Sequence, residues 1–393
     1  MNTMRALFLA LAAAAATTAL GQAFSSGSDG SNGDLNVSAN IEIPLPPSGV
    51  LNYKSVTINA GATVTFTRNA LNTPVVLLAQ GDVVLNGIID VSGSNSRPDI
   101  PDGGLPGPGG FDGGKPGFGA VPPGDGFGPG GGKGGTTKNT DALSAGGGAY
   151  GSRPGGLLND NDGQTYGNGL LIPLIGGSGG GGMVGTPGRG GGGGGGAILI
   201  ASSTKIQIAQ GGQINARGGG ARNSDGNLFN PGSGGGIRLV APVVSGNGEL
   251  VVIGGNYDHA GDGRIRIDTQ NRIGLALRLT PLSAATVGST LLINPEPLPR
   301  LDIVSAAGKS IAVGEPQPVS VILPFNSSPN QTVKLQAKDF GNVIPIRLVL
   351  TPDNGPRTVI DTEIDNKTAN PATLEVPVTL PLNVQVTIQA WTR

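Results

Sequence analysis

Short runs in which apolar and polar residues alternate recur through the first two thirds of the chain, and each run predicts a β-strand with one buried face. A third apolar stretch, such as Ile206-Gln207-Ile208, stands between two recurring patterns. The first pattern, Gly-x-[Ile/Leu]-x-[Val/Ala]-x-Gly, occurs at residues 87–93, 212–218 and 248–254. The second pattern, Gly-x-Ile-x-[Ile/Leu], occurs at residues 196–200, 235–239 and 263–267. The chain therefore contains a repeat of three short strands.

Three short strands with glycines at the corners predict one coil of a parallel β-helix. A single coil cannot bury its inward face alone, so stacked coils share one apolar core and pair their backbones with the coils on either side. Residues 56–66 and 75–91 extend the stack towards the N-terminus, and residues 35–43 are expected to cap its open end. We expect a right-handed parallel β-helix over residues 24–275.

The glycine-rich loops share one position in this repeat. They leave after the third strand of a unit, between residues 93 and 196, 218 and 235, and 254 and 263. The loops should therefore project from one edge of the β-helix. The first loop, an insertion at 94–195, is far longer than ordinary loops. Two interpretations of it stay open: a disordered low-complexity segment, or packed polyproline-II-like segments in which only glycine fits between close neighbours.

A different pattern begins after Ile273. Residues 276–300 are rich in proline, which is typical of a linker. Residues 301–393 alternate clearly, and Pro352-Asp353-Asn354-Gly355 is a turn signal between two alternating runs. Short strands at this spacing predict an immunoglobulin-like β-sandwich that is held together by packing alone. The predicted fold class is all-β throughout.

The N-terminus has the pattern of an export signal. In residues 1–23, Arg5 precedes an apolar stretch from Ala6 to Ala16, and small residues lead to Ala23. No segment of the mature chain resembles a transmembrane helix. The chain has no cysteine and a formal net charge of −1, which excludes disulfides, Cys-ligated metals and a basic surface for nucleic acid. We expect a secreted protein, extracellular or at the cell surface.

The segments Gly191 to Ile200, Gly211 to Gly220 and Gly261 to Ile267 resemble a broad group of glycine-rich secreted bacterial proteins of parallel β-helix type. The resemblance covers the chain from residue 24 to about residue 275. It implies location and architecture, and no particular activity. The chain is also similar to the larger β-helix class that includes pectin-degrading enzymes and surface adhesins.

Polysaccharide hydrolysis on a β-helix needs several carboxylates grouped on one face. Asn139-Thr140-Asp141 matches one tripeptide of polygalacturonase-like enzymes, but it lies in the insertion, and their paired aspartates and Gly-His-Gly are missing. Arg264-Ile265-Arg266 resembles their basic motif only loosely. The single histidine, His259, has Asp258 and Asp262 beside it, and a polar loop is the simpler interpretation. We expect no catalytic residues.

Calcium is the metal that this composition still allows, because it needs only oxygen ligands. The candidate ligands are Asp160 and Asp162 in one short polar stretch, and Asp29 and Asp34 in another. Neither stretch fits the EF-hand loop. Asx turns are the alternative interpretation of both stretches.

Arg238, Arg264 and Arg266 alternate with apolar residues that should point inward. We therefore expect these arginines to form an outward, solvated ladder. An acidic glycan would suit such a ladder, and a plain surface is the simpler interpretation.

These observations predict an exported structural or adhesive protein without catalytic activity. An extracellular glycan or self-association would supply its partner. No cofactor is expected, and Ca²⁺ is the one ion that the composition still allows. The alternative is a carbohydrate-binding or polysaccharide-degrading β-helix protein.

Overall fold

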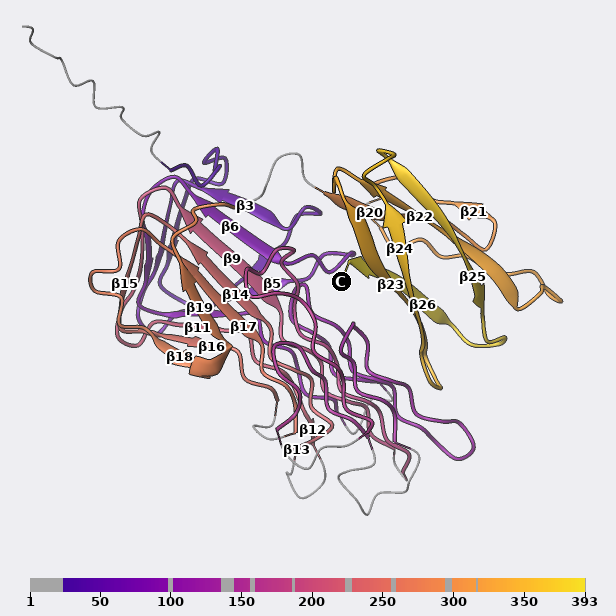
Figure 1. Ribbon diagram of the computed structural model, residues 1–393. Helices are drawn as coiled ribbons and strands as arrows, with labels where there is room; N and C mark the ends of the chain where they lie inside the picture. Colours follow the sequence, from indigo (N-terminus) through magenta and orange to yellow (C-terminus); the bar gives the residue numbers. More distant parts are fainter. Residues whose placement is uncertain are drawn as a thin grey trace, which may run out of the picture.

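The computed structural model describes residues 24–97, 102–135, 145–155, 160–185, 188–222, 228–255, 259–293, 299–315 and 317–392. Figure 1 shows three parts within these residues: a stack of parallel strands, a projection of extended chain, and an antiparallel sandwich. The described residues contain no α-helix and one short 3-10 helix, η1 (Leu282–Ala284). The fold is therefore nearly all β, as predicted. The expected signal, residues 1–23, lies outside the described residues.

Three sheets of parallel strands, here named A, B and C, form the stack. Sheet A contains β1 (Asp34–Val37), β4 (Ser55–Ile58), β7 (Val83–Leu85), β10 (Lys205–Ile208) and β15 (Val243–Gly246). Sheet B contains β2 (Ile41–Pro44), β5 (Thr63–Thr67), β8 (Ile88–Asp90), β11 (Gln213–Asn215), β16 (Glu249–Val251) and β18 (Arg278–Thr280). Sheet C contains β3 (Val50–Tyr53), β6 (Val75–Ala79), β9 (Ala197–Ser202), β14 (Gly236–Val240), β17 (Arg264–Asp268) and β19 (Ala285–Gly288). The predicted stack of parallel coils is confirmed.

The ends of the stack differ from the expected boundaries. Residues 35–43, expected to cap the N-terminal end, supply β1 and β2 of the first coil. Residues 276–288, placed in the linker by their prolines, supply β18, η1 and β19. The stack therefore extends to Gly288.

The repeat read from the sequence aligns in register across the coils. Ile89, Ile214 and Leu250 are Cα partners in β8, β11 and β16, and all three side chains are fully buried. The second pattern forms a matching row in sheet C through Ile198 and Ile237. Each such side chain stabilises the fold by about 1.5–3 kcal/mol when it leaves water. These inward rows form the core of the stack.

All three glycine-rich loops leave the stack at the same corner. They join β8 to β9, β11 to β14 and β16 to β17, and each one connects sheet B to sheet C. The second loop contains a short antiparallel pair, β12 (Ala221–Arg222) and β13 (Leu228–Phe229). The loops lie side by side in Figure 1 and project from one edge of the stack, as predicted. We call the described residues of 91–196, 216–235 and 251–263 the glycine bundle.

Hydrogen bonds in the glycine bundle follow a period of three. Successive N–H groups of residues 191–196 donate to three neighbouring segments in rotation. Their acceptors, in order, are the carbonyl oxygens of Gly114, Asn230, Ser94, Phe111, Ser233 and Val91. Every third residue thus meets the same neighbour, as expected of a helix with three residues per turn such as polyproline II.

The segments of the bundle approach each other too closely for side chains. A Cβ added at Gly194 would lie 1.9 Å from the carbonyl oxygen of Gly177, and one at Gly193 would lie 2.2 Å from that of Leu105. Only glycine lets backbones pass at such distances. Of the two interpretations of the insertion, its described residues therefore support the packed one and not the disordered one.

The C-terminal part is a sandwich of two antiparallel sheets. One sheet has the order β21 (Lys309–Ser310), β20 (Arg300–Ala306), β22 (Asn330–Lys338) and β25 (Ala372–Thr379). The other has the order β24 (Thr358–Asp365), β23 (Val343–Pro352) and β26 (Val386–Thr392). Leu335, Ile346 and Leu348 are fully buried between the sheets. The core needs no disulfide, since the chain has no cysteine.

The sandwich is docked on the glycine bundle. Lys115 Nζ lies 2.7 Å from Asp353 Oδ2, and the rings of Phe111 and Trp391 meet edge to face with centroids 5.6 Å apart. Burial lowers the pKa of Arg357, whose charge is offset by Asp125. The guanidinium of Arg357 donates to the carbonyl oxygens of Gly126, Gly128 and Gly131 at 3.3, 3.1 and 2.7 Å. These contacts join the bundle and the sandwich.

Candidate functional site

A polar groove of about 490 Å³ lies at the corner where the chain turns from sheet A into sheet B. The turns that end β10 and β15 supply glycine backbone and amide side chains. The lining residues are Gln210, Gly211, Gly212, Gln213, Asn247, Gly248, Glu249 and Arg278. Register explains their convergence, because Gln213, Glu249 and Arg278 are successive Cα partners in β11, β16 and β18.

Glu249 is the centre of the polar network in this groove. Its carboxylate accepts hydrogen bonds from Gln213 Nε2 at 2.9 Å, Arg278 Nη2 at 2.5 Å and Thr280 Oγ1 at 2.7 Å. Burial opposes ionisation, but the hydrogen bonds from Arg278 and Thr280 outweigh it and hold the pKa of Glu249 below its usual value. The same contact raises the pKa of Arg278. The groove therefore presents an ionised carboxylate flanked by amide and guanidinium donors.

The groups in this groove can form hydrogen bonds to a ligand. Hydroxyl groups of a ligand can pair with the amides of Gln210 and Asn247, which the Glu249 network leaves at the rim. A glycosidase needs two carboxyl groups across the bond to be cut, and Glu249 is the only carboxylate among the lining residues. Sequence reasoning missed this groove. The available signal was that Gln213 and Glu249 occupy the same position of the repeat.

The four aspartates predicted as calcium ligands lie in two separate places. Asp29 accepts from the N–H of Ser31 at 2.8 Å, and the hydrogen bonds from Ser31 lower the pKa of Asp29. Asp34 Oδ1 accepts from the hydroxyl of Ser55 at 2.6 Å. Both lie at the N-terminal end of the stack, in the turn before β1 and in β1 itself.

The other pair lies in the glycine bundle. Asp162 is 8% exposed, and its Oδ1 accepts from the N–H of Gly147 at 3.0 Å. The backbone carbonyl of Asp160 accepts from Lys133 Nζ at 3.3 Å. The part of the chain that the structure describes contains no cluster of three or more metal-ligating side chains. Calcium binding stays a prediction.

Of the residues considered for catalysis, His259 and Asp262 lie among the described residues. His259 is exposed, and burial raises the pKa of Asp262. The backbone of Asp262 is tied to Ser152, whose Oγ accepts from the Asp262 N–H at 2.9 Å. Asp258 and the tripeptide 139–141 lie outside the described residues.

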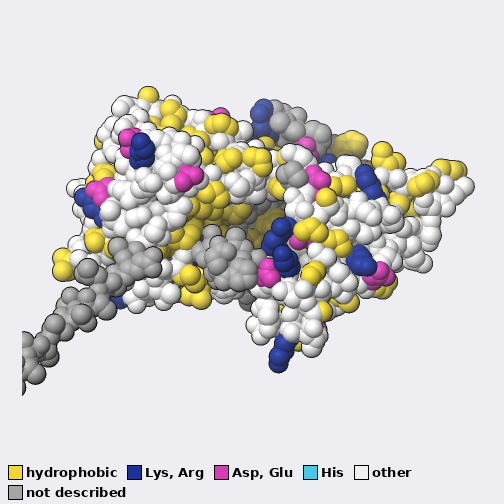
Figure 2. Space-filling view, turned by 90° about the horizontal axis from the view of Figure 1, so that it is seen from above, with side chains coloured by type: hydrophobic (Ala, Val, Ile, Leu, Met, Phe, Trp, Pro, Cys, Tyr) yellow, Lys and Arg dark blue, Asp and Glu magenta, His cyan; other side chains and the backbone are white. Residues whose placement is uncertain are grey.

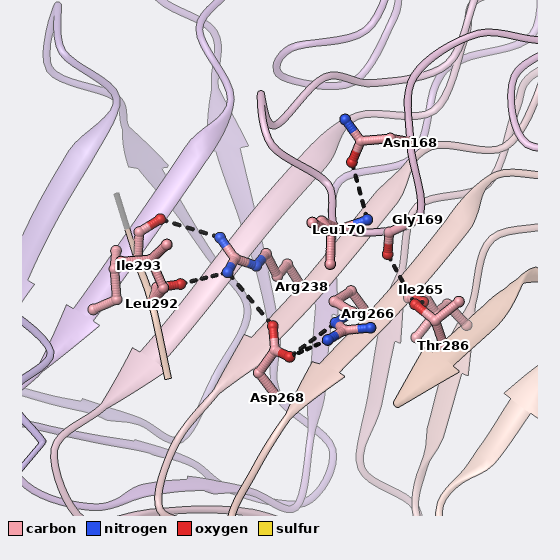
Figure 3. Close-up of polar contacts among 10 residues, drawn as sticks. All are labelled: Asn168, Gly169, Leu170, Arg238, Ile265, Arg266, Asp268, Thr286, Leu292 and Ile293. Carbon is pink, nitrogen blue, oxygen red and sulfur yellow. Dashed lines mark hydrogen bonds and ion pairs between the residues drawn. The ribbon is translucent and has the colours of Figure 1, made fainter. Parts of the chain in front are cut away.

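The predicted solvated arginine ladder is wrong. Arg238 is 3% exposed and Asp268 is 1% exposed, although both lie on the outer face of sheet C. Figure 3 shows that Arg238 points at the segment after β19, where its Nη1 donates to the carbonyl of Ile293 at 3.1 Å and its Nη2 to that of Leu292. Burial lowers the pKa of Arg238, and Asp268 opposes that shift.

Arg266 and Arg264 also form contacts within the chain. Arg266 donates to Asp268 Oδ1 from Nε at 2.9 Å and from Nη2 at 2.6 Å. Arg264 lies over the buried ring of Tyr150, 5.6 Å from its centroid, and donates to the carbonyl of Tyr166 at 2.9 Å. The expectation failed because the outer face of sheet C is covered by other parts of the chain, which strand alternation does not reveal.

Figure 2 shows Lys and Arg side chains beside Asp and Glu side chains at several places on the face in view, so this face carries charges of both signs. No helix in the described ranges is long and apolar enough to span a membrane. The chain matches no protein-family model, and no curated protein or solved structure matches it significantly. Function therefore has to be argued from the architecture and the groove.

Proposed function

We propose that this chain is an exported structural or adhesive protein, located outside the cell or on its surface and without catalytic activity. In this proposal the stack is a right-handed β-helix and the sandwich is immunoglobulin-like. Its likeness to glycine-rich secreted bacterial proteins supports the location. The partner is an extracellular glycan or a second copy of the chain, and no cofactor is required.

One observation carries this proposal: the stack, the glycine bundle and the sandwich are joined into a single body. The bundle grows out of one corner of the stack, and Arg357 of the sandwich donates to three of its backbone carbonyls. Backbone that is hydrogen-bonded in a period of three has few degrees of freedom left. A stiff body of this kind holds binding surfaces at a fixed separation, which suits a spacer or an adhesive scaffold.

The test is a binding screen on residues 24–393, against a glycan array and against intact cell surfaces, with and without Ca²⁺. Release of new reducing ends from polysaccharides is measured in parallel. Binding without turnover supports the proposal. Turnover of any polysaccharide contradicts the non-catalytic role, and absence of all binding removes the adhesive half and leaves a structural protein.

The groove favours a second candidate, a carbohydrate-binding protein. Its amide, carboxylate and guanidinium groups are those that pair with sugar hydroxyls, and they line a concave surface. Glu249→Gln and Arg278→Gln should each weaken binding of any glycan that the array identifies. Lys205→Gln is the matched control, because Lys205 pairs with Asp82 on the neighbouring sheet at 3.2 Å. Equal binding by all variants would exclude the groove.

A further inference from the structure

The C-terminal end of the parallel stack leaves its core open. Val287 of β19 is the Cα partner of Ile267 in β17. Ile267 is 1% exposed, whereas Val287 is 41% exposed, although both side chains face the core. Leu279 of β18 is the partner of the fully buried Leu250 and is itself only half-buried. Among the described residues, the last coil thus has core positions that are less covered than those of the coil before it.

The backbone at this end is open as well. β18 pairs only with β16, and β19 only with β17, so one edge of each strand has no partner among the described residues. Leu282 lies in η1 between β18 and β19 and is 73% exposed. Ile273 lies in the segment of the last coil that runs along β15 and is 84% exposed. Terminal coils of stacked repeats need a polar outer face to stay soluble alone, and open edge strands pair with other chains. At this end exposed apolar side chains stand beside exposed polar ones such as Arg272, and neither edge strand is paired among the described residues.

The N-terminal end of the stack is protected. Its edge strands β1 and β2 contain Asp34 and Glu42, and β2 ends at Pro44. Charged residues and proline on an edge strand oppose pairing with another strand. Leu51 and Tyr53 of β3, the third edge strand, are only 4% and 6% exposed. Ile41 of β2, the Cα partner of the buried Val64, is nevertheless 37% exposed. The two ends therefore differ in the charged residues and the proline of their edge strands, which β18 and β19 largely lack.

We propose that the C-terminal end of the stack binds the same end of a second copy of this chain, across a two-fold axis. Antiparallel pairing of β18 with its copy, centred on Leu279, sets the two Leu279 side chains against each other and Arg278 beside Thr280 of the second copy. Arg278 is the only charged residue of β18 and β19, and Glu249 already neutralises it at 2.5 Å. Pairing of β18 with its copy therefore sets no unpaired charge of that strand against another and covers both open cores with one surface.

This inference deepens the proposed structural role and rests on it for its biological meaning. Its test is the mass of residues 24–393 by sedimentation velocity over a wide concentration range, which should show a dimer. Val287→Lys should weaken the dimer at least about a hundredfold, because it buries a charge without a partner. Phe325→Lys is the control: Phe325 is 95% exposed in the sandwich, and its loss should leave the dimer intact.

Three outcomes would overturn the proposal: a parent chain that stays monomeric at high micromolar concentration, a Val287→Lys variant that dimerises like the parent, or a dimer that Phe325→Lys dissociates instead. Circular dichroism checks that each variant is folded.

Cysteine cross-linking gives a second readout that does not depend on a charged variant. The chain has no cysteine, so Leu282→Cys introduces one thiol at the proposed interface. A short bis-maleimide should join Leu282→Cys chains into covalent dimers and leave Phe325→Cys chains monomeric. Equal cross-linking of both would contradict the interface. Neither experiment contains a glycan, so failure of the dimer and failure of glycan binding are separate results.

Discussion

The stack and the glycine bundle both pack densely, and they do so by opposite means. In the stack, rows of large side chains such as Ile89, Ile214 and Leu250 fill the space between three sheets. In the bundle, backbone packs on backbone, and Gly194 lies where a Cβ would sit 1.9 Å from a carbonyl oxygen. Side-chain packing tolerates a change of shape, because neighbours can shift. Where backbone packs on backbone, no side chain can move aside. The bundle should therefore tolerate substitutions less well than the stack.

Adding a single methyl group inside the bundle should therefore cause the largest loss of stability. Gly194→Ala should lower the free energy of unfolding by about 4 kcal/mol or more, because the overlap involves backbone on both sides. Gly155→Ala is the control, since a Cβ there meets nothing within 4 Å. Urea denaturation of both variants measures the difference. Stabilities within about 0.5 kcal/mol of each other would show that the bundle is not close-packed.

The buried charges on sheet C should give the next largest effect. Asp268→Ala leaves Arg238 and Arg266 without their shared carboxylate in a covered site, which should destabilise the fold by about 3–5 kcal/mol. Asp82→Ala removes a carboxylate that is 46% exposed beside Lys205 and should change stability by less than about 1 kcal/mol. Thermal or urea unfolding measures both variants. If Asp268→Ala and Asp82→Ala lost similar amounts of stability, the segment after β19 would not cover the arginines.

A core truncation in the stack should have a smaller effect than either change. Ile89→Ala removes a fully buried side chain and should cost about 3 kcal/mol. Its neighbour Ile88 faces outward on β8 and is half-buried, so Ile88→Ala should cost less than about 1.5 kcal/mol. A larger loss of stability in Ile88→Ala than in Ile89→Ala would mean that the opposite face of sheet B points to the core.

The same contrast explains what the sequence reveals. Inward rows such as Ile198 and Ile237 alternate with period two, so the strands, their register and the single corner of loop exit follow from the repeat. The glycine bundle shows no such periodicity in side chains, because its order lies in which backbone each residue meets. The groove and the coverage of Arg238 both depend on residues far apart in sequence, Arg278 in one case and Ile293 in the other. Alternation identifies a face, but it does not say what covers it.

The contact between the bundle and the sandwich can be weakened without unfolding either part. Arg357→Gln removes the guanidinium that binds three glycine carbonyls and should destabilise the docked sandwich by about 2 kcal/mol. Arg347→Gln on the same sheet removes an exposed pair with Asp361 and is the control. Thermal unfolding of Arg357→Gln should split into two transitions. A single transition, unchanged in temperature, would show that the docking contributes nothing.

The smallest expected effect is a pH dependence from the groove. Because the folded-state pKa of Glu249 is depressed, its stabilising contribution is present above the unfolded pKa of about 4.3 and is lost as pH falls through the folded value. Glu249→Gln should therefore lower the stability at neutral pH and change it little at a pH below the folded pKa of Glu249, which flattens the acid limb of the stability profile. An unchanged acid limb would contradict the network around this carboxylate.

The most direct test of this account is hydrogen exchange at the backbone amides of residues 191–195. Their acceptors in neighbouring segments predict protection comparable to that of β9 and β14 in the stack. Slow exchange at these glycines, with the same denaturant dependence as the strands, is the expected result. Exchange at the rate of an unstructured chain would contradict the packed bundle and, with it, the stiff body on which the proposed function depends.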